Sequence, residues 1–551
     1  MIGSARVGLA ILLVLPAVPR EALCQIEFVL VNNSPEVREG LNQAESDANE
    51  LPPDCSKAVG DGVLITTTNR TISVYDLDNL ANAPDTLSLA EFFPFMPDLE
   101  PADDVFDART IYDNHSGRFV VSAIGPSLQG GAGTKFLHVA YSNGDGVELP
   151  DEMSPGDWFF SSINGRELDF NCDGNSQNLG VDVPTLGYDH RAWYVSPPLI
   201  GSPLQAFKTS GVIYIVHKES EDDTEITKVF TRDFTDGAGT LGCGDLEIHS
   251  FPGMGTEFPC IAKQIDSIAP AAYAVGATVD LSGQKTCALS RSSDVIRLFA
   301  VSDPLDNEHA NPTPDPDYKT RFIDMVVDCY GWDRRSVPLK SGQVAGAVDG
   351  WISSAAWRKI GNDEFLYAAH AVNIEVTLAG GTFPKTVIRR YQFKVNGWPD
   401  SANSPELFRS GEIDGGSTGS GLDARPVHLI VPAVMVNDAG DAVFVMSRTS
   451  AGEEGDETEG RLSIQATGRF HDDADGEVFE LTRIKVGSAD GATIAGAMEE
   501  VLRLGDYFDA ALDEDGETFW IFGEYIDDNG TPNDLTDDTW ATFIAHVKMP
   551  D

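Results

Sequence analysis

The stretch Asp513-Glu514-Asp515-Gly516-Glu517-Thr518-Phe519-Trp520-Ile521-Phe522 joins an acidic tight turn to a run of aromatic and β-branched residues. Asp and Gly are typical of turns, whereas Phe, Trp and Ile favour β-strands. The same pattern, here named the Asp-turn phrase, recurs along the chain with its Asp at Asp61, Asp113, Asp189, Asp280, Asp363, Asp438 and Asp513. Three of the six intervals between these residues are 75 or 76 positions long. Such a period predicts structural units that bury their hydrophobic faces by stacking on one another.

Short segments with the composition of strands accompany these phrases. They are rich in β-branched and aromatic residues and are bounded by Gly, Pro, Asn and Asp, as in all-β proteins. The clearest are 63–68, 118–124, 136–141, 212–217, 295–301, 387–395, 428–436, 442–446 and 518–525. A short helix at 492–503 and a turn at 87–92 are the helical candidates. The sequence therefore predicts an all-β fold with few helices.

Seven repeated units favour a seven-bladed β-propeller, a closed ring that leaves only short sheet edges exposed. The units are longer than the roughly 40–45 residues of a WD40 blade, which predicts long inter-strand loops. We place three such loops at 165–183, 303–318 and 449–459. We expect one propeller domain at 58–551, after a signal peptide at 1–24 and an extended segment at 25–57. A tandem of β-sandwiches is the alternative, since it contains similar turns and strands.

The first residues have the features of a secretory signal peptide. Arg6 supplies a positive charge, residues 7–18 are apolar, and Cys24 ends a tolerable cleavage site. The apolar run is too short to span a bilayer, and no later segment reaches that length. We therefore expect a secreted protein, extracellular or periplasmic, without a membrane span. A lipid anchor on Cys24 is the alternative, although Glu21 and Leu23 fit a lipobox poorly.

Cysteine usage agrees with an oxidising compartment. An even number of cysteines remains after the predicted cleavage, which predicts up to three disulfide bonds without fixing their connectivity. These residues are Cys55, Cys172, Cys243, Cys260, Cys287 and Cys329. Because no pair has C-x-x-C spacing, a zinc ribbon and a thioredoxin-like motif are unsupported.

The charge balance restricts the class of partner. The chain has 87 acidic and 38 basic residues, which gives a formal net charge of −49. Such a surface repels nucleic acids and anionic membranes, so we expect neither as a partner. Scattered acidic residues favour solubility in salt, and calcium binding by clustered carboxylates is the alternative. The expected partner is an extracellular glycan or protein, bound by a monomer.

Three stretches carry a resemblance to known proteins. They are Asp107-Ala108-Arg109-Thr110-Ile111-Tyr112-Asp113, Asp182-Val183-Pro184-Thr185-Leu186-Gly187-Tyr188-Asp189 and Arg503-Leu504-Gly505-Asp506-Tyr507. Together they resemble a broad set of exported bacterial β-propeller proteins whose activity is not settled. The resemblance implies a propeller over about 58–548 and implies nothing about chemistry. Leu504 departs from the pattern, because an aromatic residue is usual between this Arg and Gly.

One loop has the pattern of a calcium site. In Asp169-Phe170-Asn171-Cys172-Asp173-Gly174, oxygen ligands alternate along the chain and precede a Gly, as in the first half of a calcium-binding loop. The twelfth position of such a loop is Gly180 rather than Glu, so Asp182 is the candidate substitute. We predict calcium at Asp169, Asn171, Asp173 and Asp182. The alternative is an Asx-turn loop in which these side chains bind backbone amides.

Charged and polar residues within two of the resembling stretches form the candidate ligand site. They are Asp107, Arg109, Arg503, Asp506 and Tyr507. Charged groups in apolar strand sequence are costly to bury unless they are paired. One interpretation is a set of ion pairs and hydrogen bonds between blades. The other is a polar ligand site at the mouth of the propeller channel. The residues alone leave both open.

No catalytic motif stands out, and we assign no catalytic residue. Gly415-Gly416-Ser417-Thr418-Gly419 matches the nucleophile pattern G-x-S-x-G, but its Gly-rich surroundings favour a loop over a strand-to-helix elbow. Our leading hypothesis is a binding or scaffold module, stabilised by calcium. The alternative is a sialidase-like glycoside hydrolase with carboxylates at the central channel. Its candidate residues are Glu524, Tyr525, Arg390 and Arg425.

Overall fold

The computed structural model describes a large part of the chain. The described residues are 29–30, 37–42, 53–93, 105–126, 135–143, 158–164, 179–181, 183–201, 210–218, 226–230, 256–257, 259–265, 268–279, 284–285, 293–302, 319–333, 337–339, 344–345, 350–451, 460–474, 477–489, 501–502, 505–528 and 539–550. The predicted signal peptide lies outside them. Among the described residues, no helix combines the length and hydropathy that crossing a membrane requires.

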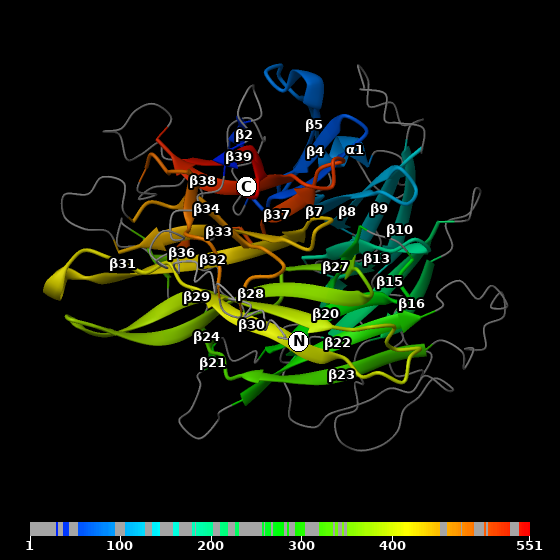
Figure 1. The fold of residues 1–551 in the computed structure, drawn as a ribbon. Helices are drawn as coiled ribbons and strands as arrows, with labels where there is room; N and C mark the ends of the chain where they lie inside the picture. Colours follow the sequence, from blue (N-terminus) through cyan, green and yellow to red (C-terminus); the bar gives the residue numbers. More distant parts are fainter. Residues whose placement is uncertain are drawn as a thin grey trace, which may run out of the picture.

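The chain folds into consecutive antiparallel sheets whose strands follow one another in sequence (Figure 1). The first sheet consists of β3 (Ser56–Gly60), β4 (Val63–Thr67), β5 (Thr71–Asp76) and β6 (Asp85–Ser88). The next is β7 (Phe106–Asp113), β8 (Arg118–Pro126), β9 (Lys135–Ser142) and β10 (Trp158–Asn164). A third run is β12 (Thr185–Tyr188), β13 (Ala192–Ser196), β15 (Ser210–His217) and β16 (Ile226–Phe230), extended by β11 (Leu179–Val181) and β14 (Pro198–Gly201).

The same order continues through the second half of the chain. One run is β18 (Cys260–Ile261), β20 (Ala272–Val279), β22 (Ser293–Ser302) and β23 (Lys319–Asp328), with β17 (Thr256–Glu257) beside β20. Another is β27 (Ser354–Ile360), β28 (Asp363–Leu378), β29 (Gly381–Lys394) and β30 (Glu406–Ile413). It is followed by β31 (Ser417–Thr418), β32 (Arg425–Val436), β33 (Ala442–Ser450), β34 (Ser463–Arg469) and β35 (Thr482–Lys485).

The last sheet combines the two ends of the chain. Its strands β37 (Asp509–Leu512), β38 (Phe519–Asp527) and β39 (Thr539–Lys548) are joined by β1 (Val29–Leu30) and β2 (Val37–Asn42), which both pair with β39. Short strands fill gaps between sheets: β19 (Lys263–Gln264), β21 (Gln284–Lys285), β24 (Trp332–Asp333), β25 (Val337–Pro338), β26 (Val344–Ala345) and β36 (Val501–Leu502). Helix is limited, in the described part of the chain, to α1 (Leu89–Phe92) and single 3-10 turns.

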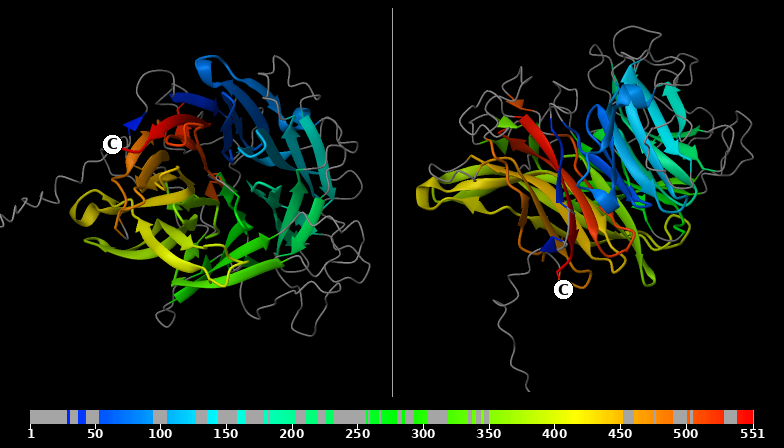
Figure 2. Two further views of the ribbon diagram at one scale, coloured as in Figure 1. Left: turned by 45° about the vertical axis from the view of Figure 1, so that its right-hand side comes forward. Right: turned by 90° about the horizontal axis from the view of Figure 1, so that it is seen from above.

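The sheets are arranged as a propeller. The first strand of each run contacts the first strand of the next, in the order β3, β7, β12, β18, β27, β32, β37, and β37 returns to β3. Figure 2 shows the sheets following one another around a centre, with the last coloured segment beside the first. The predicted all-β propeller is therefore confirmed. The count of seven blades stays a prediction, because β19 joins β12 and β27 into one eleven-stranded sheet.

The hydrophobic core lies between neighbouring sheets rather than on the ring axis. In β4, Val63 and Ile65 pack with the β7–β10 sheet, whereas Leu64 between them packs with the opposite neighbour, which contains Phe522. This alternation follows from the two-residue period of a strand. Because both faces of the sheet are covered, all five residues of β4 are buried. Similar clusters join the β7–β10 sheet to β12–β16, and β12–β16 to β18–β23.

Most copies of the Asp-turn phrase occupy the same place in the fold. Those at Asp61, Asp113, Asp189, Asp438 and Asp513 lie at the turn between the first two strands of a run, and Asp363 begins the second strand of its run. Several carboxylates tie sheets together. Asp113 accepts a hydrogen bond from Trp193 Nε1 of the next sheet at 2.9 Å, and Arg358 pairs with Asp438. The copy at Asp280 lies outside the described residues.

These turns define one face of the ring, named here the turn face. At Asp61-Gly62 the backbone has φ values of 49° and 73°, a left-handed pair that closes the β3–β4 hairpin. Such values suit Asp and Gly, and Gly117, Gly440 and Gly516 in three later copies also have positive φ. The opposite face, where each first strand begins, is named here the entry face.

The predicted upper limit of three disulfide bonds is wrong. Cys55 and Cys260 are buried free thiols, so three disulfide bonds among six cysteines do not form. Burial raises the pKa of the Cys260 thiol to about 12, which keeps it protonated and unreactive at neutral pH. Cys329 is disulfide-bonded, and every cysteine left to be its partner lies outside the described residues.

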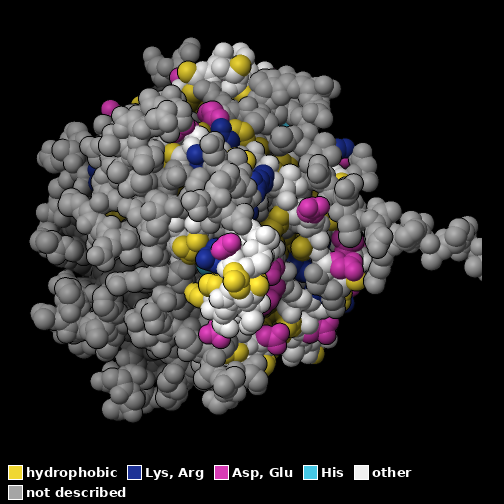
Figure 3. All heavy atoms as spheres, turned by 90° about the vertical axis from the view of Figure 1, so that its left-hand side faces the viewer, with side chains coloured by type: hydrophobic (Ala, Val, Ile, Leu, Met, Phe, Trp, Pro, Cys, Tyr) yellow, Lys and Arg dark blue, Asp and Glu magenta, His cyan; other side chains and the backbone are white. Residues whose placement is uncertain are grey.

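The acidic residues are spread over the surface. Figure 3 shows Asp and Glu side chains distributed over the face in view rather than gathered into one patch. This distribution fits the solubility interpretation of the net charge of −49. The predicted long loops at 165–183, 303–318 and 449–459 lie wholly or mainly outside the described residues.

Candidate functional site

A central channel runs between the first strands of the sheets. Three adjoining cavities of about 20 Å³ each lie along it. The entry cavity and the middle cavity share Arg109 and Thr185, and the middle cavity and the turn-end cavity share Ile111 and Lys263. The channel is thus lined by residues from β3, β7, β12, β19 and β37, which no single segment of sequence brings together.

Arg109 occupies the boundary between the entry and middle cavities. It lies on β7, is 8% exposed, and donates from Nε to the carbonyl of Pro184 at 3.1 Å. Its guanidinium lies 3.1 Å from the centre of the Tyr507 ring, a cation–π contact. The charge is therefore held by an aromatic face and a carbonyl, and Arg109 lines the channel with its position fixed.

A bulge in β7 sets the direction of Arg109. The register against β8 shifts between Phe106 and Arg109, and Asp107 inside the bulge has a φ of 53°. Asp107 accepts a hydrogen bond from the Val183 amide at 3.4 Å, which holds this strained residue against the next sheet. Bulges of this kind redirect side chains and are common beside functional sites.

Tyr507 and Asp506 complete the cluster from the other end of the chain. The Tyr507 hydroxyl donates to the Ala108 carbonyl at 2.9 Å, and burial raises its pKa, so it stays a neutral donor. The Asp506 amide donates to Asp54 Oδ1 at 2.7 Å, and Asp506 itself lines the entry cavity. These contacts join the beginning of the last sheet to the first two sheets.

The structure therefore brings four of the five predicted ligand-site residues together. Asp107, Arg109, Asp506 and Tyr507 meet where the ring closes, and Arg503 lies outside the described residues. Their contacts match the inter-sheet interpretation, and two of them also line the channel. The two interpretations are compatible. Whether the cluster binds a ligand stays a prediction.

The entry cavity combines an aromatic surface with polar groups. Half-buried Trp351 and buried Ile352 form its apolar part, and Thr185, Ser353 and Ser196 add hydroxyl groups. Ser196 is 1% exposed, and its hydroxyl has no hydrogen-bond partner among the described residues. A buried hydroxyl without a partner retains hydrogen-bonding capacity for a ligand or a water.

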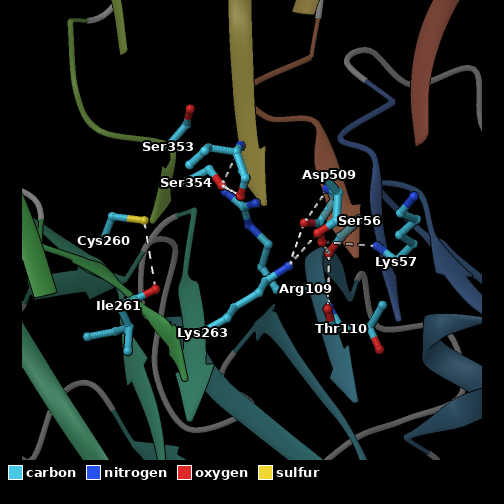
Figure 4. A network of polar contacts seen from close by, with 12 residues as sticks. Ser56, Lys57, Arg109, Thr110, Cys260, Ile261, Lys263, Ser353, Ser354 and Asp509 are labelled. Atoms are coloured by element: carbon cyan, nitrogen blue, oxygen red, sulfur yellow. Dashed lines mark hydrogen bonds and ion pairs between the residues drawn. The ribbon is translucent and has the colours of Figure 1, made fainter. Parts of the chain in front are cut away.

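An ion pair crosses the middle of the channel. Lys263 of β19 reaches Asp509 of β37 at 2.5 Å, and Figure 4 shows its side chain extending across to that carboxylate. The other carboxylate oxygen accepts hydrogen bonds from the Ser56 hydroxyl at 2.9 Å and the Lys57 amide at 3.2 Å. Lys263 lines both the middle and the turn-end cavity, so this pair lies where those two cavities adjoin.

Lys57 is an unusual residue of the turn-end cavity. It is fully buried, and its Nζ has no hydrogen-bond partner among the described residues. Desolvation by burial lowers its pKa well below the usual range, and Lys263 acts in the same direction, while Asp509 opposes the shift. Its backbone contacts Asp509, whereas its side chain extends away from that carboxylate (Figure 4).

Glu524 is a second buried group with no partner, on the entry side of the last sheet. It is 1% exposed, and neither carboxyl oxygen has a hydrogen-bond partner among the described residues. Burial, followed by the charge of Asp506, raises its pKa to about 8. Gly505 has a φ of 34°, and a Cβ there would lie 3.0 Å from Glu524 Oε2, so this residue combines a left-handed backbone with a close approach to Glu524.

The candidate residues of the hydrolase alternative make contacts outside the channel cavities, and the alternative itself stays a prediction. Tyr525 donates to Glu39 Oε2 at 2.6 Å, and Arg390 in β29 donates to the Glu477 carbonyl at 3.5 Å. Arg425 begins β32 and binds the carbonyls of Leu422 and Ala424. None of these residues, nor Glu524, lines the three channel cavities. They fail to converge because sequence proximity does not identify which strand faces the axis.

The remaining motifs have simple outcomes. Ser417 is exposed in the two-residue strand β31 against β32, so the G-x-S-x-G match is a loop feature, as expected. The predicted calcium ligands Asp169, Asn171, Asp173 and Asp182 lie outside the described residues. Within the described part of the chain, no group of three or more His, Cys, Asp or Glu side chains is arranged to hold a metal ion.

Sequence reasoning missed most of the channel lining, although a signal for it exists. Lys57, Arg109, Thr185 and Asp509 each stand four positions before the Asp of an Asp-turn phrase, and each lines a channel cavity. Residues four apart on a strand share a face. At these four phrases the polar residue at this offset lines the channel, whereas Lys359, four positions before Asp363, is exposed and lines none of the three cavities.

Comparisons with known proteins give distant structural matches. No family model matches the chain, and no curated protein does. The Trypanosoma rangeli sialidase in complex with sialic acid is 10% identical with a TM-score of 0.32, over 78% of this chain and 52% of that chain. This chain thus spans about half the length of that first match.

Two further solved structures have similar scores. The hemagglutinin-neuraminidase ectodomain of parainfluenza virus 5 is 8% identical with a TM-score of 0.35, over 83% of this chain and 84% of that one. Drosophila Semaphorin 1b is 9% identical with a TM-score of 0.33, over 96% and 87%. Likeness at this level carries no argument about activity, so function rests on the channel itself.

Proposed function

We propose that the protein is a secreted binding module that holds one end of an extracellular glycan in the entry cavity. The single observation that carries this proposal is the composition of that cavity. Its lining includes half-buried Trp351, Arg109, Asp506 and Ser196, whose hydroxyl has no hydrogen-bond partner among the described residues. Secretion is part of the proposal and is supported by the apolar leader at 7–18.

The lining suits the hydroxyl groups of a sugar. The cavity volume of about 20 Å³ is far below the roughly 300–1,000 Å³ of small-molecule pockets, so only one projecting group of a glycan would enter it. An aromatic ring gives apolar contact area to the C–H face of a sugar, and carboxylate, guanidinium and hydroxyl groups bind its hydroxyls. Because these groups match the hydroxyls of a sugar, the glycan is favoured over a protein ligand.

Binding without turnover is favoured by the state of the carboxylates. A glycosidase needs two carboxyl groups on either side of the scissile bond. In the channel, Asp509 is engaged by Lys263, by Ser56 and by the Lys57 amide, and Asp506 is the acid of the entry cavity. Glu524 has the raised pKa of a general acid but is buried outside the channel lining.

A glycan array is the direct test. The wild-type protein should bind a defined group of glycans, and Trp351→Ala should weaken binding about tenfold or more through loss of the aromatic contact. Ser196→Ala should weaken it about three- to tenfold, as expected for one hydrogen bond. Phe408→Ala is the matched control, because Phe408 is an exposed aromatic residue on β30 outside the cavity.

Two outcomes would contradict the proposal. One is the absence of glycan binding by the wild type, or equal binding by Trp351→Ala. The other is turnover of any sugar in a panel of fluorogenic glycosides, which would make the protein a hydrolase.

Calcium stabilisation is a separate part of the proposal. It rests on the alternating oxygen ligands of the 169–175 loop, with Asp182 nearby. Calorimetric titration with Ca²⁺ should give a binding isotherm for the wild type that Asp173→Ala abolishes. Asp423→Ala, a change at an exposed acid in another loop, should leave the isotherm unchanged. Equal heats of binding from Asp173→Ala and the wild type would contradict calcium binding by this loop.

A further inference from the structure

The middle cavity of the channel has more cationic than anionic side chains in its lining. Arg109 and Lys263 contribute two positive charges against the one negative charge of Asp509, although the formal net charge of the chain is −49. Figure 4 shows Arg109 and Lys263 extending from different strands into the space beside Asp509. Because Lys263 and Asp509 form an ion pair at 2.5 Å, the excess positive charge is that of Arg109.

The carboxylate of Asp509 has no capacity left for a second cation. Its Oδ1 accepts hydrogen bonds from Lys263 Nζ at 2.5 Å and from the Ala510 amide at 2.9 Å. Its Oδ2 accepts from the Ser56 hydroxyl at 2.9 Å and from the amide of the following residue at 3.2 Å. The two oxygens of a carboxylate offer about four acceptor sites, so these bonds fill them. Asp509 therefore compensates Lys263 only.

The two cations retain N–H donors that no described residue uses. Arg109 is 8% exposed; its Nε donates to the Pro184 carbonyl, and its guanidinium lies on the Tyr507 ring. Neither contact brings a full negative charge, and the terminal nitrogens of Arg109 have no hydrogen bond or ion pair with a described residue. Lys263 Nζ uses two of its three donors, on Asp509 and, at 3.4 Å, on the Ala510 carbonyl. The cavity thus presents donors in excess of acceptors.

Other carboxylates do not supply the missing negative charge. Asp107 accepts from the Val183 amide, Asp506 lines the entry cavity, and neither lines the middle cavity or forms an ion pair with Arg109. The exposed acidic side chains act weakly over distance, because ions screen exposed charges beyond about 8 Å at physiological salt. A buried cation without a counterion is costly, so an anion from solvent would stabilise Arg109.

The size of the cavity restricts the class of anion. Its volume of about 20 Å³ exceeds the roughly 10–15 Å³ that one water molecule needs, but it leaves no room for a polyatomic anion. A monatomic anion satisfies both the size and the charge, and chloride is the common one in solution.

We infer that the middle cavity binds one chloride ion between the terminal nitrogens of Arg109 and the third N–H of Lys263. The ion compensates the guanidinium that connects the second sheet to Pro184 of the third and to Tyr507 of the last. It therefore stabilises the ring where its two ends meet. The inference does not rest on the glycan proposal, because no step of its argument or its test uses a glycan.

Bromide soaking with anomalous diffraction locates the ion directly, because bromide replaces chloride and scatters anomalously. Wild-type crystals grown without chloride and soaked in sodium bromide should give a peak at hydrogen-bonding distance from the terminal nitrogens of Arg109. Anomalous peaks only at exposed positions, or a water molecule alone in the cavity, would overturn the inference.

Thermal unfolding tests the same site in solution. Sodium chloride should raise the Tm of the wild type saturably above its value in sodium gluconate of equal ionic strength, because a ligand of the folded state stabilises it. Arg109→Met should abolish this difference in Tm. Arg321→Met is the matched control: Arg321 is an exposed arginine on β23 outside the cavity, so its change should preserve the difference.

A second variant keeps both cations and alters only the space. Ala355 lines the middle cavity, so Ala355→Val should reduce the chloride-dependent rise in Tm by filling part of the volume. Equal Tm values of the wild type in chloride and gluconate, or a full rise in Arg109→Met, would contradict chloride binding. The diffraction experiment uses the wild type, so it decides the question whatever the stability of the variants.

Discussion

Two buried ionisable groups, one near each face of the ring, have charged forms of opposite sign. Near the entry face, but outside the channel lining, Glu524 has no hydrogen-bond partner among the described residues, and burial raises its pKa to about 8. Toward the turn face, Lys57 has no partner for its Nζ in the part of the chain that the structure describes, and burial lowers its pKa. Each shift favours the neutral form, by proton gain at one end and proton loss at the other. Lys263 and Asp509, in contrast, are each other's ion-pair partner at 2.5 Å.

The two pKa shifts make the free energy of unfolding change with pH in opposite directions. A carboxyl with a raised pKa contributes stability below its unfolded value of about 4.3 that is lost as pH rises through about 8. A lysine with a lowered pKa contributes its full stability above about 10.4, and this is lost as pH falls through its folded value. Glu524 therefore lowers the free energy of unfolding at high pH, and Lys57 lowers it at low pH.

Removal of the central ion pair should have the largest effect. Asp509→Ala leaves the half-buried Lys263 ammonium and the Ser56 hydroxyl without their acceptor, and we expect a loss of about 3–5 kcal/mol in the free energy of unfolding. Urea denaturation measures the loss. The double variant Asp509→Asn, Lys263→Met should recover much of it, because no unpaired charge remains. A loss from Asp509→Ala below about 0.5 kcal/mol would show that the pair is not structural.

Glu524→Gln should abolish the pH dependence assigned to the entry side. Between about pH 4.5 and pH 8, Glu524 should lower the free energy of unfolding by about 1.4 kcal/mol for each pH unit. The variant lacks this slope and should be more stable than the wild type at pH 9. Denaturation series at several pH values give both slopes. Parallel wild-type and variant curves would contradict the raised pKa of Glu524.

Lys57→Met should stabilise the protein in the absence of ligand. The change replaces a buried amine that has no hydrogen-bond partner with an apolar chain of similar length, and we expect a gain of about 1–3 kcal/mol at pH 7. Since folding requires Lys57 to give up a proton that the unfolded chain binds more strongly, this cost rises as pH falls, and the gain should increase toward pH 5. Thermal unfolding of both proteins measures it. A destabilised variant would mean that Lys57 has a structural partner after all.

Tyr507→Phe should have the smallest effect of this series. The hydroxyl donates to the Ala108 carbonyl, whereas the ring that carries Arg109 is retained, so we expect a loss of about 1 kcal/mol. Tyr507→Leu removes the ring as well and should cost more. If the two variants were equally stable, the cation–π contact with Arg109 would contribute nothing measurable.

Much of the fold could be predicted because it depends on local signals. The Asp-turn phrase located the turns between first and second strands, and segments such as 118–124 and 428–436 lie within β8 and β32. The closure by β2 could not be predicted in this way. Its sequence, Val37-Arg38-Glu39-Gly40-Leu41-Asn42, lacks strand composition, and its pairing with β39 is set by the position of the last sheet.

The candidate site was predicted in part for a similar reason. Arg109, Asp506 and Tyr507 attracted notice as polar residues within apolar sequence, and they do meet at the closure of the ring. Lys57 and Trp351 were not predicted, because nothing in the local sequence distinguishes a side chain that faces the channel from one that faces a neighbouring sheet. That distinction depends on strand register, which only the assembled ring fixes.

The pairing of β2 with β39 has a consequence for how the molecule forms. Val37 lies opposite Ala545, so this ladder joins residues about 500 positions apart in the sequence. Contacts of such long range are slow to form, and the entropy of closing a loop of that size is on the order of 5 kcal/mol. Strand β2, which is synthesised early, therefore cannot pair with β39 until nearly the whole chain has been synthesised.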